Sequence, residues 1–211
     1  MRPYSRHLLF LLIGVFVLSG CTLATVVSLE DDEVAKEGFV AEKYVEEVWD
    51  AQFMPAMESG AIEIVQLLSE IDANQTAATT AYGNRTSTGP YSFMTRGEAQ
   101  ILGLNRESRV GLAALDLAPY DGTADVYLAI GPVLRGNALR DSVRFIAFND
   151  FTNQVEFAQV SDALKRRIAD QVLGVTDLDA LVGQTVRFMG AFTLDDRDEI
   201  VIMPVRLEAA Q

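Results

Sequence analysis

Residues 131–173 read GPVLRGNALRDSVRFIAFNDFTNQVEFAQVSDALKRRIADQVL and lie between two blocks of sequence in which apolar and polar residues alternate. The second half of this stretch changes to a helical period. Its apolar residues recur every three or four positions and would share one face of a helix: Phe157, Val160, Leu164, Ile168 and Val172. Gly174 follows as a natural helix end. The sequence therefore predicts one long helix between two groups of strands.

Three strands are predicted before this central stretch. The first begins near Tyr91, with charged and amide side chains on one face and, on the inner face, Phe93, Thr95, Gly97, Ala99 and Ile101. Gly97 in the middle of this strand predicts a bulge or a sharp bend. The second strand, 110–117, is apolar on both faces, and the third ends at Ile130.

Two strands are predicted after the helix. The fourth strand covers 186–192, and the fifth covers 200–207, where Pro204 predicts an edge or a bulge. The order strand–strand–strand–helix–strand–strand is that of an OB-fold, a five-stranded and partly open barrel. We therefore expect residues 90–211 to form an OB-like β-barrel domain, mainly β with helices (α+β). A β-sandwich fits less well, because one long helix separates the two groups of strands.

Residues 31–89 are predicted to form a helical segment that leads into the barrel. Trp49 lies in an apolar stripe with helical spacing, which favours core packing over stacking against a sugar ring. Pro55 is expected in the first turn of a second helix, since proline is tolerated there. That second helix carries an apolar stripe formed by Ile64, Leu67, Leu68 and Ile71.

The first 21 residues have the three parts of a bacterial secretion signal: a basic start, an unbroken apolar run, and small residues before Cys21. The tetrad Leu18-Ser19-Gly20-Cys21 resembles the lipobox of bacterial lipoproteins, in which the chain is cut before the cysteine and the cysteine carries lipid. We expect residues 1–20 to be a signal peptide and residues 21–30 a lipidated tether. An uncleaved membrane anchor is the alternative, because the uncharged segment is long enough to span a bilayer.

The composition argues against several functions. The formal net charge is −13, and it becomes −15 once Arg2 and Arg6 are removed with the signal peptide. Such a surface repels nucleic-acid phosphates and anionic lipid headgroups. The only cysteine is Cys21 and the only histidine is His7. The domain therefore has no cysteine or histidine that could serve as a nucleophile, a base or a metal ligand. We expect no catalytic residues, no metal and no cofactor.

The central stretch also holds the candidate site residues. Charged and amide side chains alternate there with phenylalanines, a combination that suits hydroxyl-rich ligands. The predicted ligand- or partner-binding residues are Arg135, Arg140, Asp141, Asn149, Asp150, Asn153 and Gln154. The alternative is that these groups cap helices and satisfy loop backbone, with Thr152 as the helix cap and an ion pair between Arg140 and Asp141. Asp141 and Asp150 are also the carboxylates that a hydrolase of oligosaccharides would use.

Several motifs resemble those of a bacterial family. They are Gly131-Pro132-Val133, Arg135-Gly136, Ala138-Leu139-Arg140-Asp141 and Phe151-Thr152-Asn153-Gln154, with further matches at Trp49, Pro55, Tyr82-Gly83, Gly190-Ala191-Phe192 and Pro204-Val205. Along most of its length the chain is similar to a family of predicted periplasmic lipoproteins of unknown function, whose members are often encoded beside sugar ABC transporters. Asn137 departs from the small hydroxyl residue expected at its position. The resemblance implies a periplasmic location and a connection with sugar uptake, and it supplies no catalytic residue.

We therefore expect a lipid-anchored, non-enzymatic protein of the bacterial envelope, exposed to the periplasm, that serves as an accessory or binding component of a sugar ABC-transport system. Its expected partners are the membrane, through the lipid, and transporter components or a carbohydrate, but not nucleic acid. A carboxylate-dependent hydrolase acting on oligosaccharides and a purely structural envelope lipoprotein are the alternatives. Thr22 follows the cysteine where an aspartate would indicate retention in the inner membrane, which leaves either membrane open.

Overall fold

The computed structural model describes residues 38–210 with the exception of 87, 196 and 198. The described residues from Phe39 onward form one compact unit. The predicted signal peptide, Cys21, the tether and the start of the helical lead lie outside the described residues. In the part of the chain that the structure describes, no helix is long and apolar enough to cross a membrane.

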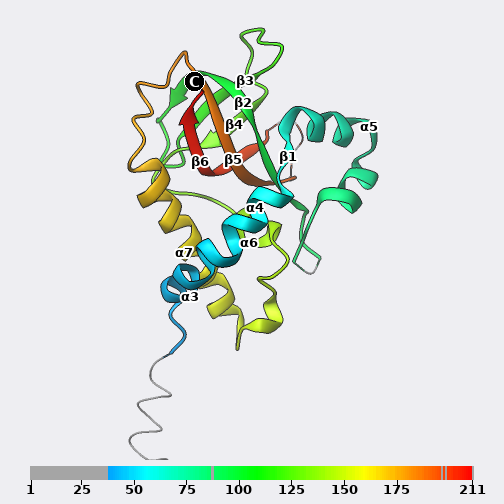
Figure 1. Cartoon of the computed structure of the whole chain (residues 1–211), viewed down its shortest axis with the longest axis vertical. Helices are drawn as coiled ribbons and strands as arrows, with labels where there is room; N and C mark the ends of the chain where they lie inside the picture. Colours follow the sequence, from blue (N-terminus) through cyan, green and yellow to red (C-terminus); the bar gives the residue numbers. More distant parts are fainter. Residues whose placement is uncertain (1–37, 87, 196, 198, 211) are drawn as a thin grey trace, which may run out of the picture. The chain divides into compact units, whose positions relative to one another are not determined.

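The strands pair into one mixed sheet, which lies in the upper part of Figure 1 above the helices α3 (Ala41–Val48), α6 (Ala138–Ser142) and α7 (Gln154–Ile168). Its main strands are β2 (Ser92–Asn105), β3 (Leu112–Leu117), β4 (Val126–Ala129), β5 (Thr185–Thr193) and β6 (Val201–Ala209). The order β2–β3–β4–β6–β5 returns to β2, because β2 pairs with both β3 and β5. Neighbours in this ring are antiparallel, except that β4 and β6 run parallel. Each of these strands therefore has a hydrogen-bonded partner on both sides.

The sheet has six strands rather than the predicted five. The additional strand, β1 (Ile62–Glu63), runs parallel to β2 opposite Thr95 and Arg96. The hydroxyl group of Thr95 donates to the carbonyl oxygen of Ile62 at 2.9 Å, and the Arg96 guanidinium donates to the Glu63 carboxylate at 2.7 Å. Two residues are too few to show a strand period, so β1 is not visible in the sequence.

The buried face of β2 is confirmed, but the bulge predicted at Gly97 is wrong. Phe93, Thr95, Ala99 and Ile101 are buried. The register between β2 and β5 runs unbroken through Gly97, and the irregularity in β2 lies between Ile101 and Gly103. A Cβ atom on Gly97 would lie 2.7 Å from Cγ2 of Ile64. Gly97 therefore makes room for an isoleucine of the neighbouring helix and does not form a bulge.

The irregularity predicted at Pro204 is present. β6 pairs with β5, and the register shifts where Gly190 lies opposite Pro204 and Met189 lies opposite Arg206. Proline lacks an amide proton, so it is tolerated in a sheet where the ladder is interrupted. The start of β6 turns to a different partner, because Val201 lies opposite Tyr127 of β4.

The first helical region contains α3 (Ala41–Val48), a π-helical turn (Trp49–Phe53) and α4 (Met54–Gly60). Pro55 lies in the first turn of α4, as predicted. Proline cannot donate a backbone hydrogen bond to the preceding turn, which accounts for a wider turn at this point. Trp49 is buried, as predicted, and its ring stacks on Phe53 with 4.9 Å between centroids.

The helix α5 (Ile64–Tyr82) follows β1 and buries the predicted stripe of Ile64, Leu67, Leu68 and Ile71. The backbone leaves the helical conformation at Asn74, where the helix is kinked. The Asn74 side chain accepts a hydrogen bond from the amide of Ala77 at 3.0 Å. Asn74 therefore acts as a cap for the second half of α5.

The central stretch folds as α6 (Ala138–Ser142), a short 3₁₀ turn (Phe148–Asp150), α7 (Gln154–Ile168) and a π-helical turn (Ala169–Leu173). The predicted face of the long helix is buried at Phe157, Val160, Leu164 and Ile168, whereas Val172 lies beyond α7 and is partly exposed. α7 packs against α3, and α6 packs against β2 and β5. Apolar residues from the helices and from the sheet belong to one continuous core, so the described helices between Phe39 and residue 90 are part of the same unit as the sheet.

Candidate functional site

A cavity of about 790 Å³ lies beside the central stretch. Its walls come from the segment 84–86, from the segment 137–149 and from the first turns of α7. The polar and aromatic side chains that line it are Asn84, Arg85, Thr86, Asn137, Arg140, Asp141, Arg144, Phe148, Asn149, Gln154 and Phe157. The fold thus brings residues from two distant parts of the sequence to one concave surface.

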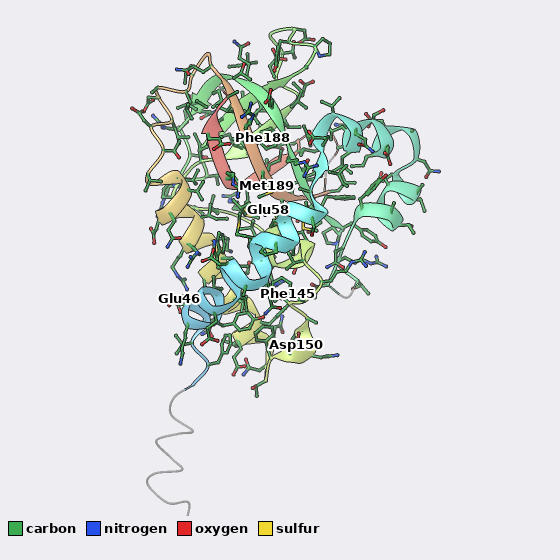
Figure 2. All side chains as sticks on the ribbon, viewed as in Figure 1. Glu46, Glu58, Phe145, Asp150, Phe188 and Met189 are labelled. Carbon is green, nitrogen blue, oxygen red and sulfur yellow. The ribbon has the colours of Figure 1, made fainter. Side chains whose placement is uncertain are left out.

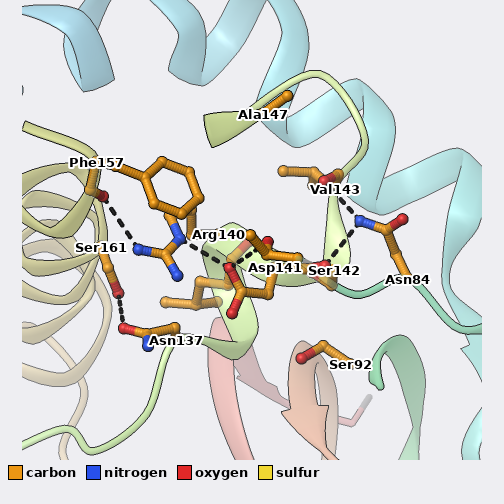
Figure 3. A network of polar contacts seen from close by, with 12 residues as sticks. Asn84, Ser92, Asn137, Arg140, Asp141, Ser142, Val143, Ala147, Phe157 and Ser161 are labelled. Carbon is orange, nitrogen blue, oxygen red and sulfur yellow. Dashed lines mark hydrogen bonds and ion pairs between the residues drawn. The ribbon is translucent and has the colours of Figure 1, made fainter. Parts of the chain in front are cut away.

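Arg140 is the buried charge of this cavity, and only 6% of it is exposed. Its Nε atom donates to Oδ1 of Asp141 at 2.7 Å, and Nη1 donates to the carbonyl oxygen of Phe157 at 3.1 Å. The guanidinium carbon lies 3.7 Å from the centroid of the Phe157 ring (Figure 3). The ion pair predicted between Arg140 and Asp141 is therefore present within α6, and the contacts of Arg140 with Phe157 join α6 to α7.

Asn84 and Thr86, from the segment before β2, also hold Asp141, and Figure 3 shows Asn84 on the side of Asp141 away from Phe157. The Thr86 hydroxyl group donates to Oδ1 of Asp141 at 3.0 Å. The Asn84 side chain donates to the carbonyl oxygens of Asp141 and Val143 at 2.8 and 3.0 Å. Because the backbone of Asn84 also pairs with Ser92, the segment before β2 is fixed to α6. Both side-chain contacts of the carboxylate use Oδ1, so Oδ2 makes no hydrogen bond with a described residue.

Aromatic rings form the apolar side of the cavity. Phe148 and Phe157 meet edge to face with 5.5 Å between centroids, and Phe148 is 44% exposed. Phe157 also contacts Phe151, whose ring packs against Tyr44. Burial raises the pKa of Tyr44, and the nearby Asp150 carboxylate adds to this shift. An exposed ring beside amide groups is a surface that can accept the apolar face of a sugar.

The structure brings four of the predicted site residues together in the cavity, namely Arg140, Asp141, Asn149 and Gln154. Arg135 instead lines a separate cavity of about 330 Å³ beside β3, β4 and β6. Asp150 lies in the 3₁₀ turn (Figure 2), where its carboxylate accepts a hydrogen bond from the Ala147 amide at 3.0 Å. Asn153 does not line the larger cavity and caps α7.

Asn153, not Thr152, is the N-cap of α7. Its Oδ1 atom accepts hydrogen bonds from the amides of Val155 and Glu156 at 2.9 and 3.0 Å. Thr152 contributes its backbone amide, which donates to the Glu156 carboxylate at 2.9 Å. Both residue types are good caps, so the sequence alone did not separate them.

Asn153→Ala is expected to lower the free energy of unfolding by about 1 kcal/mol, because two amides of the first turn lose their acceptor. The matched control is Asn149→Ala, since Asn149 is exposed and its side chain makes no hydrogen bond with a described residue. That control should stay within about 0.5 kcal/mol of the wild type. Denaturant titration of both variants checks the difference, and equal small losses would contradict the capping role.

Sequence reasoning missed the part of the cavity contributed by Asn84, Arg85 and Thr86, and it also missed Arg144. The segment 84–86 reads as an ordinary connection between two elements, and nothing local places it near α6. Arg85 packs over the Tyr91 ring with 4.5 Å to the centroid. With Arg140 and Arg144 it brings three guanidinium groups to the cavity, whose lining contains a single carboxylate, that of Asp141.

Metal chemistry has no support in the described residues. No cluster of three or more histidine, cysteine, aspartate or glutamate side chains there could hold a metal ion. The cavity offers hydrogen-bond donors, amide groups and aromatic rings, which equip it to hold a polar organic molecule rather than a cation.

The element order and the sheet topology define an α+β protein with a mixed six-stranded sheet. A solved structure described as an OB-fold protein from Thermotoga maritima is similar, with a TM-score of 0.69 and 18% sequence identity, over 82% of this chain and 99% of that chain. This likeness concerns the fold alone.

The chain belongs to the family of predicted periplasmic lipoproteins known as DUF2291, whose model matches residues 11–208. This confirms the lipoprotein family that the sequence motifs resemble, and it identifies the protein as an envelope lipoprotein of predicted periplasmic location. A search of curated proteins finds no match to the chain.

Proposed function

We propose that the protein is a lipid-anchored, non-enzymatic binding component of the bacterial envelope. Cys21 carries the lipid, and the OB-like barrel domain is exposed to the periplasm. The cavity beside α6 and α7 captures a carbohydrate or a component of a sugar ABC-transport system. The connection with sugar uptake rests on the gene neighbourhood that the resemblance implies, and the binding role rests on the cavity.

The observation that carries the binding role is the composition of the cavity. Its volume of about 790 Å³ lies in the range of small-molecule sites. The amide groups of Asn149 and Gln154 and the exposed ring of Phe148 face one concave surface. A purely structural lipoprotein has no need for such a surface, because the network of Arg140 and Asp141 already joins the helices without it.

The same cavity argues against the hydrolase alternative. Glycoside hydrolysis by the usual mechanisms requires two carboxyl groups on either side of the scissile bond. Among the described residues that line the cavity, only Asp141 carries a carboxylate, and it is paired with Arg140. Asp150, the second candidate, caps a turn outside the cavity. This arrangement supports binding rather than hydrolysis.

One experiment in cells tests both the anchor and the cavity. Cys21→Ser should lose all incorporation of a labelled fatty acid, because serine offers no thiol for acylation. Thr22→Ser keeps the thiol and should be labelled like the wild type. Asn149→Ala/Gln154→Ala should stay lipidated and folded, since both side chains are exposed, but should capture less of the partner when the protein is isolated from its native envelope.

The matched control for the cavity is Gln52→Ala/Gln171→Ala, which removes two exposed amides outside the cavity. Equal fatty-acid label in the wild type and in Cys21→Ser would refute the anchor. Equal capture by the cavity variant and its control would refute the binding role.

A further inference from the structure

The cavity concentrates positive charge in an acidic protein. The chain has 30 aspartate and glutamate residues against 17 lysine and arginine residues. The lining of the cavity reverses this balance, with Arg85, Arg140 and Arg144 against Asp141 alone. A concave site of one sign attracts a ligand of the other sign, because low-dielectric walls focus the field.

Arg140 has a donor that the protein leaves unused. Its side chain is held on two sides, by the Asp141 carboxylate and by the carbonyl oxygen of Phe157. Its Nη2 atom makes no hydrogen bond with any described residue (Figure 3). Nη2 remains accessible to solvent in the cavity, so this donor is available to an acceptor on a bound molecule.

Arg85 and Arg144 add two further cationic groups. Both side chains are exposed, and neither forms an ion pair with a described carboxylate. The Arg85 guanidinium is oriented by the Tyr91 ring beneath it. A planar guanidinium held in one orientation loses little freedom on binding and matches the two oxygens of a carboxylate.

We propose that the ligand of this cavity is a sugar acid, a molecule with several hydroxyl groups and one carboxylate. The inference rests on the proposed binding function and names its ligand class. The carboxylate binds the guanidinium groups, and the hydroxyl groups bind the amides of Asn149 and Gln154 and the unused Oδ2 atom of Asp141. The ring of Phe148 covers an apolar face of the sugar.

A ligand with a single negative charge suits this protein better than a ligand with a phosphate group. A phosphate monoester carries about −1.5 to −2 charges at neutral pH and is repelled more strongly by the net negative charge of the protein. A monocarboxylate is still attracted by the three guanidinium groups, and it is repelled less by the negative charge of the rest of the protein.

The test is isothermal titration of the full-length lipoprotein in detergent with D-glucuronate, D-glucose and glucose 6-phosphate. D-Glucuronate should bind at least about tenfold more tightly than either of the other two probes. Arg144→Gln should weaken glucuronate binding about tenfold, which corresponds to about 1.4 kcal/mol. Arg135→Gln removes the same charge from the separate, smaller cavity and should change the affinity less than about twofold.

The outcomes separate this inference from the proposed function. If D-glucose binds as tightly as D-glucuronate and Asn149→Ala/Gln154→Ala abolishes both, the cavity is a sugar site and the sugar-acid inference is wrong. Tighter binding of glucose 6-phosphate overturns the choice of a carboxylate. If Arg135→Gln weakens glucuronate binding as much as Arg144→Gln does, the attraction comes from the overall charge of the protein. The sugar-acid inference is then also wrong. If no probe binds while capture from the envelope depends on the cavity, the inference fails and the binding function stands.

Discussion

Arg140→Ala is expected to lower the free energy of unfolding by about 3 kcal/mol. Arg140 is buried and joins three groups: the Asp141 carboxylate, the carbonyl oxygen of Phe157 and the face of the Phe157 ring. Its removal leaves a carboxylate that is only 19% exposed without its countercharge. For a unit of this size the loss corresponds to a decrease in melting temperature of about 6–12 °C.

The matched control is Arg106→Ala. Arg106 also forms an ion pair with a carboxylate, that of Asp179, at 2.9 Å, but the two side chains are 51% and 72% exposed. Solvent screening limits such a pair to about 0–1 kcal/mol. Thermal melts of both variants decide the matter, and similar small losses would mean that the Arg140 network does not stabilise the fold.

Gly190→Ala is expected to lower the free energy of unfolding by about 3 kcal/mol, for a steric reason. Gly190 lies in β5 where the register with β6 shifts. A Cβ atom there would lie 2.3 Å from the carbonyl oxygen of Met203 and 2.7 Å from a methyl group of Ile202. The backbone of a paired strand cannot move aside locally, so the two strands would have to separate.

Gly103→Ala is the control for this substitution. Gly103 is also in a strand, β2, but a Cβ atom there has no neighbour within 4 Å among the described residues. Alanine should leave stability unchanged or raise it by up to about 1 kcal/mol, because it restricts the unfolded chain more than glycine does. Chemical denaturation compares the pair. If Gly190→Ala is as stable as Gly103→Ala, the close approach of β5 and β6 is not a constraint.

The strands of the ring are predictable because each carries a local signal. In β2, buried Phe93 and Ile101 share a face while exposed Arg96 and Glu98 share the other, so the period of two is visible without any tertiary knowledge. The long helix is predictable for the same reason. β1 is different, since its two residues become a strand only through the contact with Thr95 and Arg96.

The candidate site is only partly predictable. Arg140 and Asp141 are neighbours in the sequence, so their ion pair can be anticipated. The contact of Asn84 with Asp141 joins residues 57 positions apart, and no local sequence pattern predicts it. The cap of α7 shows a further limit, because adjacent Thr152 and Asn153 are both favourable caps and the sequence does not distinguish them. No spacing or motif in the sequence distinguishes Arg144 from any other exposed arginine.

The closure of the sheet through β2 and β5 has a consequence for the kinetics of folding. Ser92 lies opposite Thr193, and the two hydroxyl groups are within 2.9 Å although 101 positions separate them in the chain. Bringing such distant segments together lowers the entropy of the intervening chain before any stabilising contact has formed. Folding is therefore slow. A chain that emerges with its N-terminus first has β2 available long before β5. One edge of β2 therefore stays unpaired until residue 193 has appeared, and formation of the complete sheet is a late event that needs almost the whole chain.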